Sequence, residues 1–459
     1  MKRSVALVTF IALGLVFSWR GSYADENRAA ANAGSGAKTQ QEQIDELKQM
    51  IEENQRQNQE LQKRLEQLES ERTGEKMKLE ELKAKEEEKG AVSDLTNFLK
   101  SIKPGLYIDT SYEFNFNNPK SSNNQLRIFD TEHNAFNINL AQIYLERIPT
   151  IEGGYANLVG FRVKLDFGED TDVFHARGLG GDEFDLQEAF IHVLAPVGKG
   201  LDIYVGKFVT LAGAEVIESK DNFNFSRSLL FGFAIPFTHT GIRLHYAAAP
   251  LDFTIGVNNG WDVVKDNNKG KTVEARIGLT YGIFSIGVVD YVGPEQDNSD
   301  SHFRNLIDVV ASITPTKKLN LVANFDYGIE QKVTNPDLGL VDKRVSWWGI
   351  AGYIVYDLSD VVRLVLRGEY FDDRNGVRTV SSIATPISGT TVPGGKKYWE
   401  LTPTLQLKPF ARYKPFDNFI VRLEYRHDQA NKDVFEKSNG DLRKFQDTIA
   451  AEFMYYFGY

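Results

Sequence analysis

The sequence predicts an antiparallel outer-membrane β-barrel of about 16 strands, preceded by an α-helical coiled coil. Three observations support this fold class: a last strand with one aromatic-rich face, sixteen segments of alternating apolar and polar residues, and connections that alternate between short and long. In such a barrel the apolar residues face lipid and the alternate residues face a polar interior. A soluble all-β domain also alternates, but it would seldom carry so many charges of both signs on the opposite face.

The chain begins with the features of a secretory signal peptide, which we expect over residues 1–24. Lys2 and Arg3 precede the apolar run Val5–Trp19, which is too short to favour the alternative of a membrane anchor. The sequence has no cysteine, in agreement with an oxidising compartment. Residues 25–38 are small and polar and predict a flexible linker.

A heptad repeat predicts a periplasmic coiled-coil oligomerisation helix over residues 39–89, followed by a linker over residues 90–104. Asn54 and Asn58 occupy core positions, where asparagine costs stability but fixes the register and the number of helices. A lone charged helix is the alternative. The heptads do not decide between a dimer and a trimer, and the rest of the chain favours a trimer. The predicted core positions are Ile44, Leu47, Ile51, Asn54, Asn58, Leu61, Leu65 and Leu68.

Alternation with period two then continues to the end of the chain and predicts the barrel over residues 105–459. Short turns, such as Ala195–Gly200, alternate with long polar loops, such as Asn118–His133. This pattern of periplasmic turns and external loops places both ends of the barrel in the periplasm. The predicted strands lie near residues 105–117, 134–148, 157–168, 184–194, 201–209, 237–248, 251–259, 271–281, 283–292, 304–314, 318–328, 346–356, 361–371, 397–408, 418–427 and 447–459.

The last strand carries the strongest of these signals. Its apolar face needs lipid, and its two edges each need a partner strand, which a closed barrel provides. The edge strand of a soluble sandwich is the alternative. The apolar residues of this face are Ile449, Ala451, Phe453, Tyr455, Phe457 and Tyr459, and we expect Phe453, Tyr455, Phe457 and Tyr459 to act in barrel assembly.

The third long loop, residues 210–236, is rich in apolar residues and needs a surface on which to pack. We expect it to fold inward and narrow the pore, with a cover over the rim or over a subunit interface as the alternative. Its charged residues at the predicted constriction are Glu215, Glu218, Lys220, Asp221 and Arg227.

Short motifs around this loop resemble the OmpL-like family of β-barrel porins. They follow in the family's order: Gly206-Lys207-Phe208, Glu215-Val216-Ile217, Asp221–Ser228 and Ala234–Gly241. The resemblance implies a passive diffusion channel whose third loop enters the pore, and it implies no particular solute. The coiled coil is not part of the resemblance and is an added periplasmic extension.

Charged residues of the predicted inner wall face this loop. Two pairs of arginines are spaced by four on nearby strands and could form a basic ladder that favours anions. Alternatively, Glu369 and Glu424 pair with these arginines and keep the lumen wet; the sequence does not decide between the two. The wall residues that we expect to set selectivity are Arg162, Lys164, Arg243, Arg363, Arg367, Arg422 and Arg426.

Other functions find little support in the sequence. The seven histidines are scattered and do not have the spacing of a metal site, and no catalytic nucleophile can be nominated. The chain has a net charge of −10 and lacks a basic stripe that would bind nucleic acid. We therefore expect a homotrimeric porin in outer-membrane lipid that passes small hydrophilic solutes or ions, without enzymatic activity, cofactor or metal. A structural barrel is the alternative: a sheath for a partner such as a cytochrome, or a cell-wall tether whose coiled coil contacts peptidoglycan.

Overall fold

The computed structural model describes residues 39–152, 154–179, 184–379 and 396–458. The expected signal peptide, the linker predicted to follow it and Tyr459 lie outside the described residues. The chain divides into two compact units, Met1–Val92 and Ser93–Tyr459. Among the described residues, no helix combines the length and the apolar character needed to cross a bilayer.

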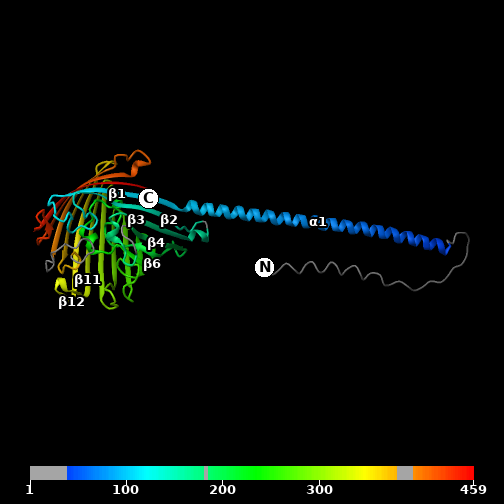
Figure 1. Cartoon of the computed structure of the whole chain (residues 1–459), viewed down its shortest axis with the longest axis horizontal. Helices are drawn as coiled ribbons and strands as arrows, with labels where there is room; N and C mark the ends of the chain where they lie inside the picture. The colour runs from blue at the N-terminus through cyan, green and yellow to red at the C-terminus, as the bar shows by residue number, and fades with distance from the viewer. Residues whose placement is uncertain (1–38, 153, 180–183, 380–395, 459) are drawn as a thin grey trace. The chain divides into compact units, whose positions relative to one another are not determined.

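Helix α1, Gln40–Ser101, is continuous over 62 residues (Figure 1). The predicted linker over residues 90–104 is therefore wrong for most of its length. Leu95, Phe98 and Leu99 have helical spacing, and no proline interrupts the helix before Pro104. All eight predicted core positions are exposed in the single chain, and the coiled coil stays a prediction.

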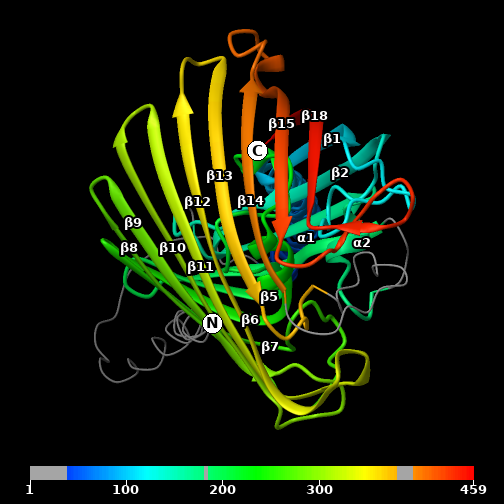
Figure 2. The ribbon, with the colours of Figure 1, turned by 90° about the vertical axis from the view of Figure 1, so that its left-hand side faces the viewer.

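The second unit is a closed barrel of sixteen antiparallel strands (Figure 2). Each strand pairs with its neighbours along the chain, and β18 closes the barrel between β15 and β1. The predicted fold class and strand number are confirmed. The strands are β1 (Lys103–Asn115), β2 (Ala135–Arg147), β3 (Val159–Phe167), β4 (Phe184–Ala195), β5 (Leu201–Val209), β6 (Thr238–Ala248), β7 (Leu251–Asn258), β8 (Thr272–Tyr281), β9 (Phe284–Pro294), β10 (Phe303–Thr316), β11 (Leu319–Asn335), β12 (Leu340–Asp357), β13 (Val362–Asp373), β14 (Lys396–Leu407), β15 (Phe419–Ala430) and β18 (Phe445–Phe457).

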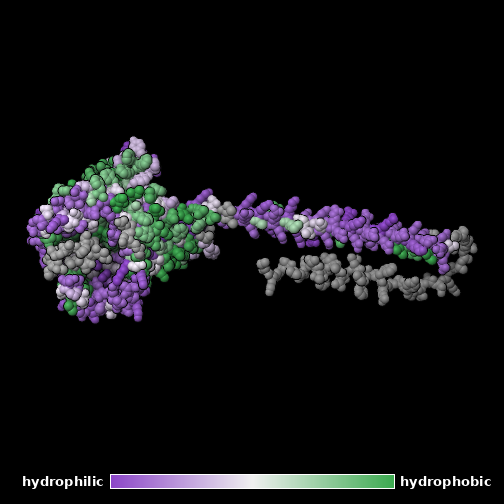
Figure 3. Space-filling view, viewed as in Figure 1, coloured by the Kyte–Doolittle hydropathy of each residue, from purple (hydrophilic) through white to green (hydrophobic). Residues whose placement is uncertain are grey.

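The last strand shows how the sequence pattern builds the wall. Ile449, Phe453 and Phe457 lie on the exposed outer face, whereas Thr448 and Glu452 lie on the buried inner face. Such alternation gives the barrel an apolar exterior and a polar interior. On the face drawn in Figure 3, hydrophobic residues gather over the strands and hydrophilic residues gather toward the long loops.

Connections alternate in length as predicted, so we name the two ends of the barrel the short-turn end and the long-loop end. One loop prediction is wrong. Residues 330–344 belong mostly to β11 and β12, which turn at Pro336–Leu338, and Gly339 takes the left-handed conformation that ends this turn. The small elements outside the wall are α2 (Thr171–Phe174), the hairpin of β16 (Phe435–Glu436) and β17 (Leu442–Arg443), and the helical turns Tyr155–Leu158, Ser219–Asp221, Leu230–Ala234 and Phe416–Asn418.

Candidate pore site

The third loop, residues 210–237 between β5 and β6, lies inside the barrel (Figure 2). The Ala214 amide donates to the Asn324 Oδ1 atom on β11 (3.1 Å), and the Lys220 amide donates to the Tyr107 hydroxyl on β1 (3.2 Å). These two strands are far apart in the barrel order. The loop therefore spans the lumen and is not a cover over the rim.

Apolar side chains of the third loop form a core inside the lumen. Phe231 packs against Phe129 of the first loop, residues 116–134, with ring centroids 5.9 Å apart. Trp347 on β12 is fully buried and donates its indole N–H to the Ala234 carbonyl oxygen (3.0 Å). Burial of these aromatic surfaces holds the loop against the wall.

The first loop is a part of the site that the sequence analysis missed. Its segment Leu126-Arg127-Ile128-Phe129 is buried, and the Arg127 guanidinium pairs with the Asp428 carboxylate on β15 (2.7 Å). Three apolar residues within four positions of a polar loop are the signal that could have revealed this packing.

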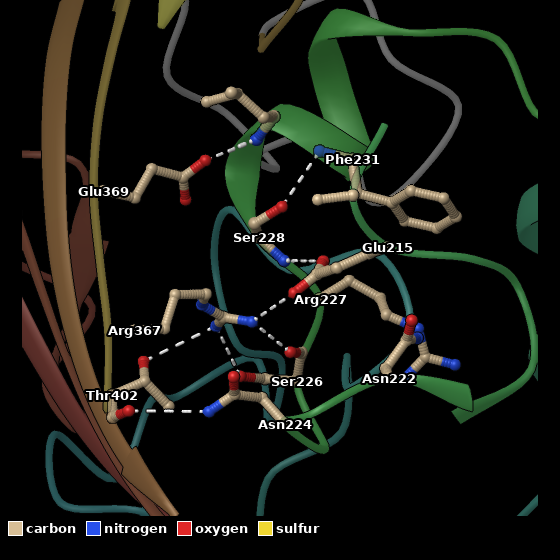
Figure 4. Close-up of polar contacts among 12 residues, drawn as sticks. Glu215, Asn222, Asn224, Ser226, Arg227, Ser228, Phe231, Arg367, Glu369 and Thr402 are labelled. Atoms are coloured by element: carbon tan, nitrogen blue, oxygen red, sulfur yellow. Dashed lines mark hydrogen bonds and ion pairs between the residues drawn. The ribbon is translucent and has the colours of Figure 1, made fainter. Parts of the chain in front are cut away.

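Arg367 on β13 is the centre of the contacts between the loop and the wall (Figure 4). Its guanidinium donates to the carboxylates of Glu215 in the loop (2.8 Å) and Glu400 on β14 (2.7 Å). It also donates to the Ser226 carbonyl oxygen (2.5 Å) and hydroxyl (2.9 Å). The Glu215 carboxylate in turn accepts from the Ser228 amide (2.7 Å). One buried wall cation thus ties together two separate stretches of the loop.

Two wall carboxylates bind the loop through its backbone. Glu369 on β13 accepts from two successive amides, those of Leu229 and Leu230 (both 2.6 Å). Glu424 on β15 accepts from the amides of Phe225 (2.8 Å) and Ser226 (2.9 Å) in the same way. Charge-assisted bonds to paired amides satisfy backbone donors that the loop would otherwise bury without partners.

Two more arginines on β15 bind carbonyl oxygens of the loop. Arg422 donates to the carbonyls of Ser219 (2.9 Å) and Asn222 (2.6 Å) and pairs with Glu452 (3.1 Å). Arg426 donates to the Arg227 carbonyl oxygen (2.7 Å). The wall arginines therefore donate hydrogen bonds to carbonyl oxygens of the loop, and the wall glutamates accept hydrogen bonds from its amides.

Glu218 anchors the loop to the opposite wall. The Lys164 ammonium on β3 lies 2.5 Å from its Oε1 atom and 2.9 Å from the Glu188 carboxylate on β4. Burial alone would raise the pKa of the Glu218 carboxyl, but the charge of Lys164 lowers it to about 2. Glu218 therefore stays ionised over the ordinary range of pH.

The other charged residues of the loop have different surroundings. Arg227 is buried, donates to the carbonyls of Ile217 and Phe225 (2.6 Å to the latter) and lies over the Phe129 ring (4.7 Å). Lys220 forms an ion pair with Asp221. Of the five predicted loop residues, Asp221 has the most exposed side chain, at 56 %.

Near the short turns the wall charges are open to water, and we call this part of the lumen the vestibule. Arg162 pairs there with Glu146, and Arg363 pairs with Asp357 (2.6 Å); the two arginine side chains are 32 % and 33 % exposed. Arg243, closer to the loop, is buried and pairs with Glu274 (2.7 Å).

The predicted basic ladder is not found among the described residues. Arg367, Arg422 and Arg426 are almost fully buried against the loop, and only Arg363 reaches the vestibule. These arginines also do not pair mainly with Glu369 and Glu424, as the alternative prediction had it. Those carboxylates bind loop amides instead, because the loop occupies the space between the two sets of side chains.

Comparison with known proteins agrees with this geometry. The model of the family described as "Putative beta-barrel porin-2, OmpL-like" matches residues 101–457. A search of curated proteins found none that matches. Similar solved structures include an anion-selective porin from Comamonas acidovorans (10 % identity, TM-score 0.50, 78 % of this chain and 99 % of that one) and Salmonella typhi OmpF in complex with daunomycin (12 %, 0.50, 78 % and 97 %). The trimer form of OmpT from Vibrio cholerae is also similar (13 %, 0.49, 78 % and 99 %).

The structural matches share the barrel fold at low sequence identity, and the family model covers the whole barrel. The chain therefore belongs to the OmpL-like family of β-barrel porins and is a protein of the outer membrane.

Proposed function

We propose that the protein is a passive diffusion channel for small hydrophilic solutes or ions and that it has no enzymatic activity. The observation that carries this proposal is the third loop, which is bound to both sides of a closed, polar-lined barrel by buried charges. A loop held in this way divides the lumen into a narrow centre and a wider vestibule. Charged groups at a constriction order water and orient polar solutes that pass.

Selectivity, in this proposal, arises where charges remain open to water. Asp221 in the loop and Arg162 and Arg363 in the vestibule are the predicted site residues with the most exposed charged groups. The buried arginines set the width of the passage, because they fix the position of the loop.

We further propose a homotrimer that is held together in the periplasm by a coiled coil of α1. The apolar heptad residues Ile44, Leu61 and Leu65 are exposed in the single chain, and association would remove them from water. Contact of this coiled coil with peptidoglycan belongs to the same proposal.

Single-channel recording in a planar lipid bilayer under a salt gradient tests the channel. We expect discrete conductance steps, in groups of three for a trimer. Folded protein that gives no conductance would overturn the proposal and favour the structural barrel. One observation favours this second function, the structural barrel: the wall side chains around the third loop are buried, as they would be in a barrel whose lumen is closed.

A further inference from the structure

A cavity of about 350 Å³ lies against the inner wall formed by β2 to β6. Its lining runs from Glu146 near the short turns to Phe208 and Val209 at the root of the third loop. The volume is at the small end of the range for ligand pockets, roughly 300–1,000 Å³. A solute that moves between the vestibule and the loop would pass along this surface.

Aromatic rings form one part of this cavity. The rings of Phe190 and Tyr204 meet edge to face, with centroids 5.4 Å apart. His192 stacks on Tyr204 (4.3 Å) and is held by a hydrogen bond to the Asp202 carboxylate (2.7 Å). These contacts fix the orientation of Tyr204, and a half-buried, fixed ring is a flat apolar surface for a ligand.

Paired charged side chains line the other part of the cavity. Arg162 bonds to Glu146 and to Glu188 (3.2 Å) and lies 5.7 Å from the Phe190 ring centroid. Arg243 likewise pairs with Glu274. Carboxylates already pair with these guanidinium groups, which weakens the attraction of the guanidinium groups for a free ion. Their remaining N–H groups and lone pairs can still exchange hydrogen bonds with hydroxyl groups, which both donate and accept.

A sugar ring matches this surface, because its C–H face is apolar and its edge carries hydroxyl groups. We propose that the cavity is a binding subsite for a neutral carbohydrate of one or two rings. The sugar ring stacks on Tyr204, and its hydroxyl groups bond to Glu146 and Arg162. The subsite rests on the proposed channel function for its biological use, but binding itself does not require conduction.

Saturation-transfer NMR with trehalose tests the subsite on the full chain, in an amine-oxide detergent that carries no sugar headgroup. We expect saturation of the ring C–H protons of trehalose and no displacement by inorganic phosphate. Tyr204→Ala should weaken binding about tenfold, the loss of a stacking contact. Tyr281→Ala, at an exposed short turn, is the matched control and should bind as the wild type does.

The possible outcomes separate the two proposals. Trehalose binding by a protein that does not conduct would support the subsite and overturn the channel. Conductance without saturation transfer, or displacement of trehalose by phosphate, would overturn the subsite and leave the channel. If Tyr204→Ala does not fold, Tyr204→Leu keeps apolar bulk but removes the flat ring, and unchanged binding by that variant would overturn the stacking role.

Discussion

The centre of the lumen and the vestibule contain the same kinds of residue in the same strand pattern, yet their surroundings differ. Arg367, in the centre, is 0 % exposed and donates hydrogen bonds to five groups of the loop and wall. Arg363, four residues earlier on the same strand, is one-third exposed, and within the described part of the chain it forms its side-chain hydrogen bonds and ion pair with Asp357 alone. The difference shows that depth along the strand, more than residue type, decides whether a wall charge is structural or available to solutes.

The physical reason is the third loop. Where it docks, it removes water, and each buried charge must then be matched by a charge or a hydrogen bond. In the vestibule, water itself can solvate the charges and screen their pairing. We therefore expect substitutions of charged residues to lower the stability strongly in the centre of the lumen and weakly in the vestibule.

Arg367→Ala should have the largest effect on stability. It leaves the buried carboxylate of Glu215 without its cation and removes the nearer of two cations from Glu400, at a cost of about 3–5 kcal/mol. Arg363→Ala is the matched control and should cost about 0–1 kcal/mol, because its ion pair is exposed. Melting temperatures of the two variants in detergent check the comparison. Equal losses would show that depth does not divide the wall charges as proposed.

Lys164→Met should change how the attachment of the loop depends on pH. The pKa of Glu218 is lowered to about 2, so its contribution to stability is complete above its unfolded pKa, about 4.3, and is lost as the pH falls toward 2. Without Lys164, burial would raise this pKa, and the loop should loosen at higher pH. Trypsin is not active in acid, so pepsin cleavage of the loop between pH 2 and 5 is a suitable measurement.

Lys437→Met, in an external loop, provides the control for this experiment, since its pair with Asp441 is exposed. The same pH profile for both variants would contradict the anchoring role of Lys164.

Glu369→Gln should have a smaller effect. The carboxylate accepts from two loop amides, and an amide side chain with a single oxygen cannot replace both bonds, so we expect a loss of about 1–3 kcal/mol. The loop should become accessible to trypsin at Lys220 and Arg227. Glu146→Gln in the vestibule removes a half-buried carboxylate instead, and comparable cleavage of that variant would mean that Glu369 does not hold the loop.

Most of the wall was predictable from sequence because period-two alternation reports directly which residues face lipid. The strand ends near residues 330–344 were not predictable, because these residues are mostly polar and lack apolar alternation although they continue β11 and β12 as an exposed hairpin. The charged residues of the site were identified, but not their partners. Whether Arg367 meets Glu215 or Glu369 depends on where the third loop docks, and no local pattern encodes a contact between residues 152 positions apart.

The smallest expected effect on stability, and the sharpest test of the vestibule, comes from Lys408→Glu. A cavity of about 340 Å³ at the short turns near β13 is lined by four cations, Lys317, Lys318, Arg363 and Lys408, and by two carboxylates, Asp357 and Asp360. The substitution balances these charges, so the reversal potential under a salt gradient should move toward cations while the melting temperature stays unchanged.

The salt dependence of this shift separates it from a structural effect. The Debye length is about 10 Å at 0.1 M salt and about 3 Å at 1 M, so the shift should be clear at low salt and weak at high salt. Lys437→Glu makes the same charge change in an external loop and should move the reversal potential less. An equal shift from both variants would mean that net charge alone sets selectivity; a larger shift from Lys408→Glu would place the selective region in the vestibule, where the wall charges remain open to water.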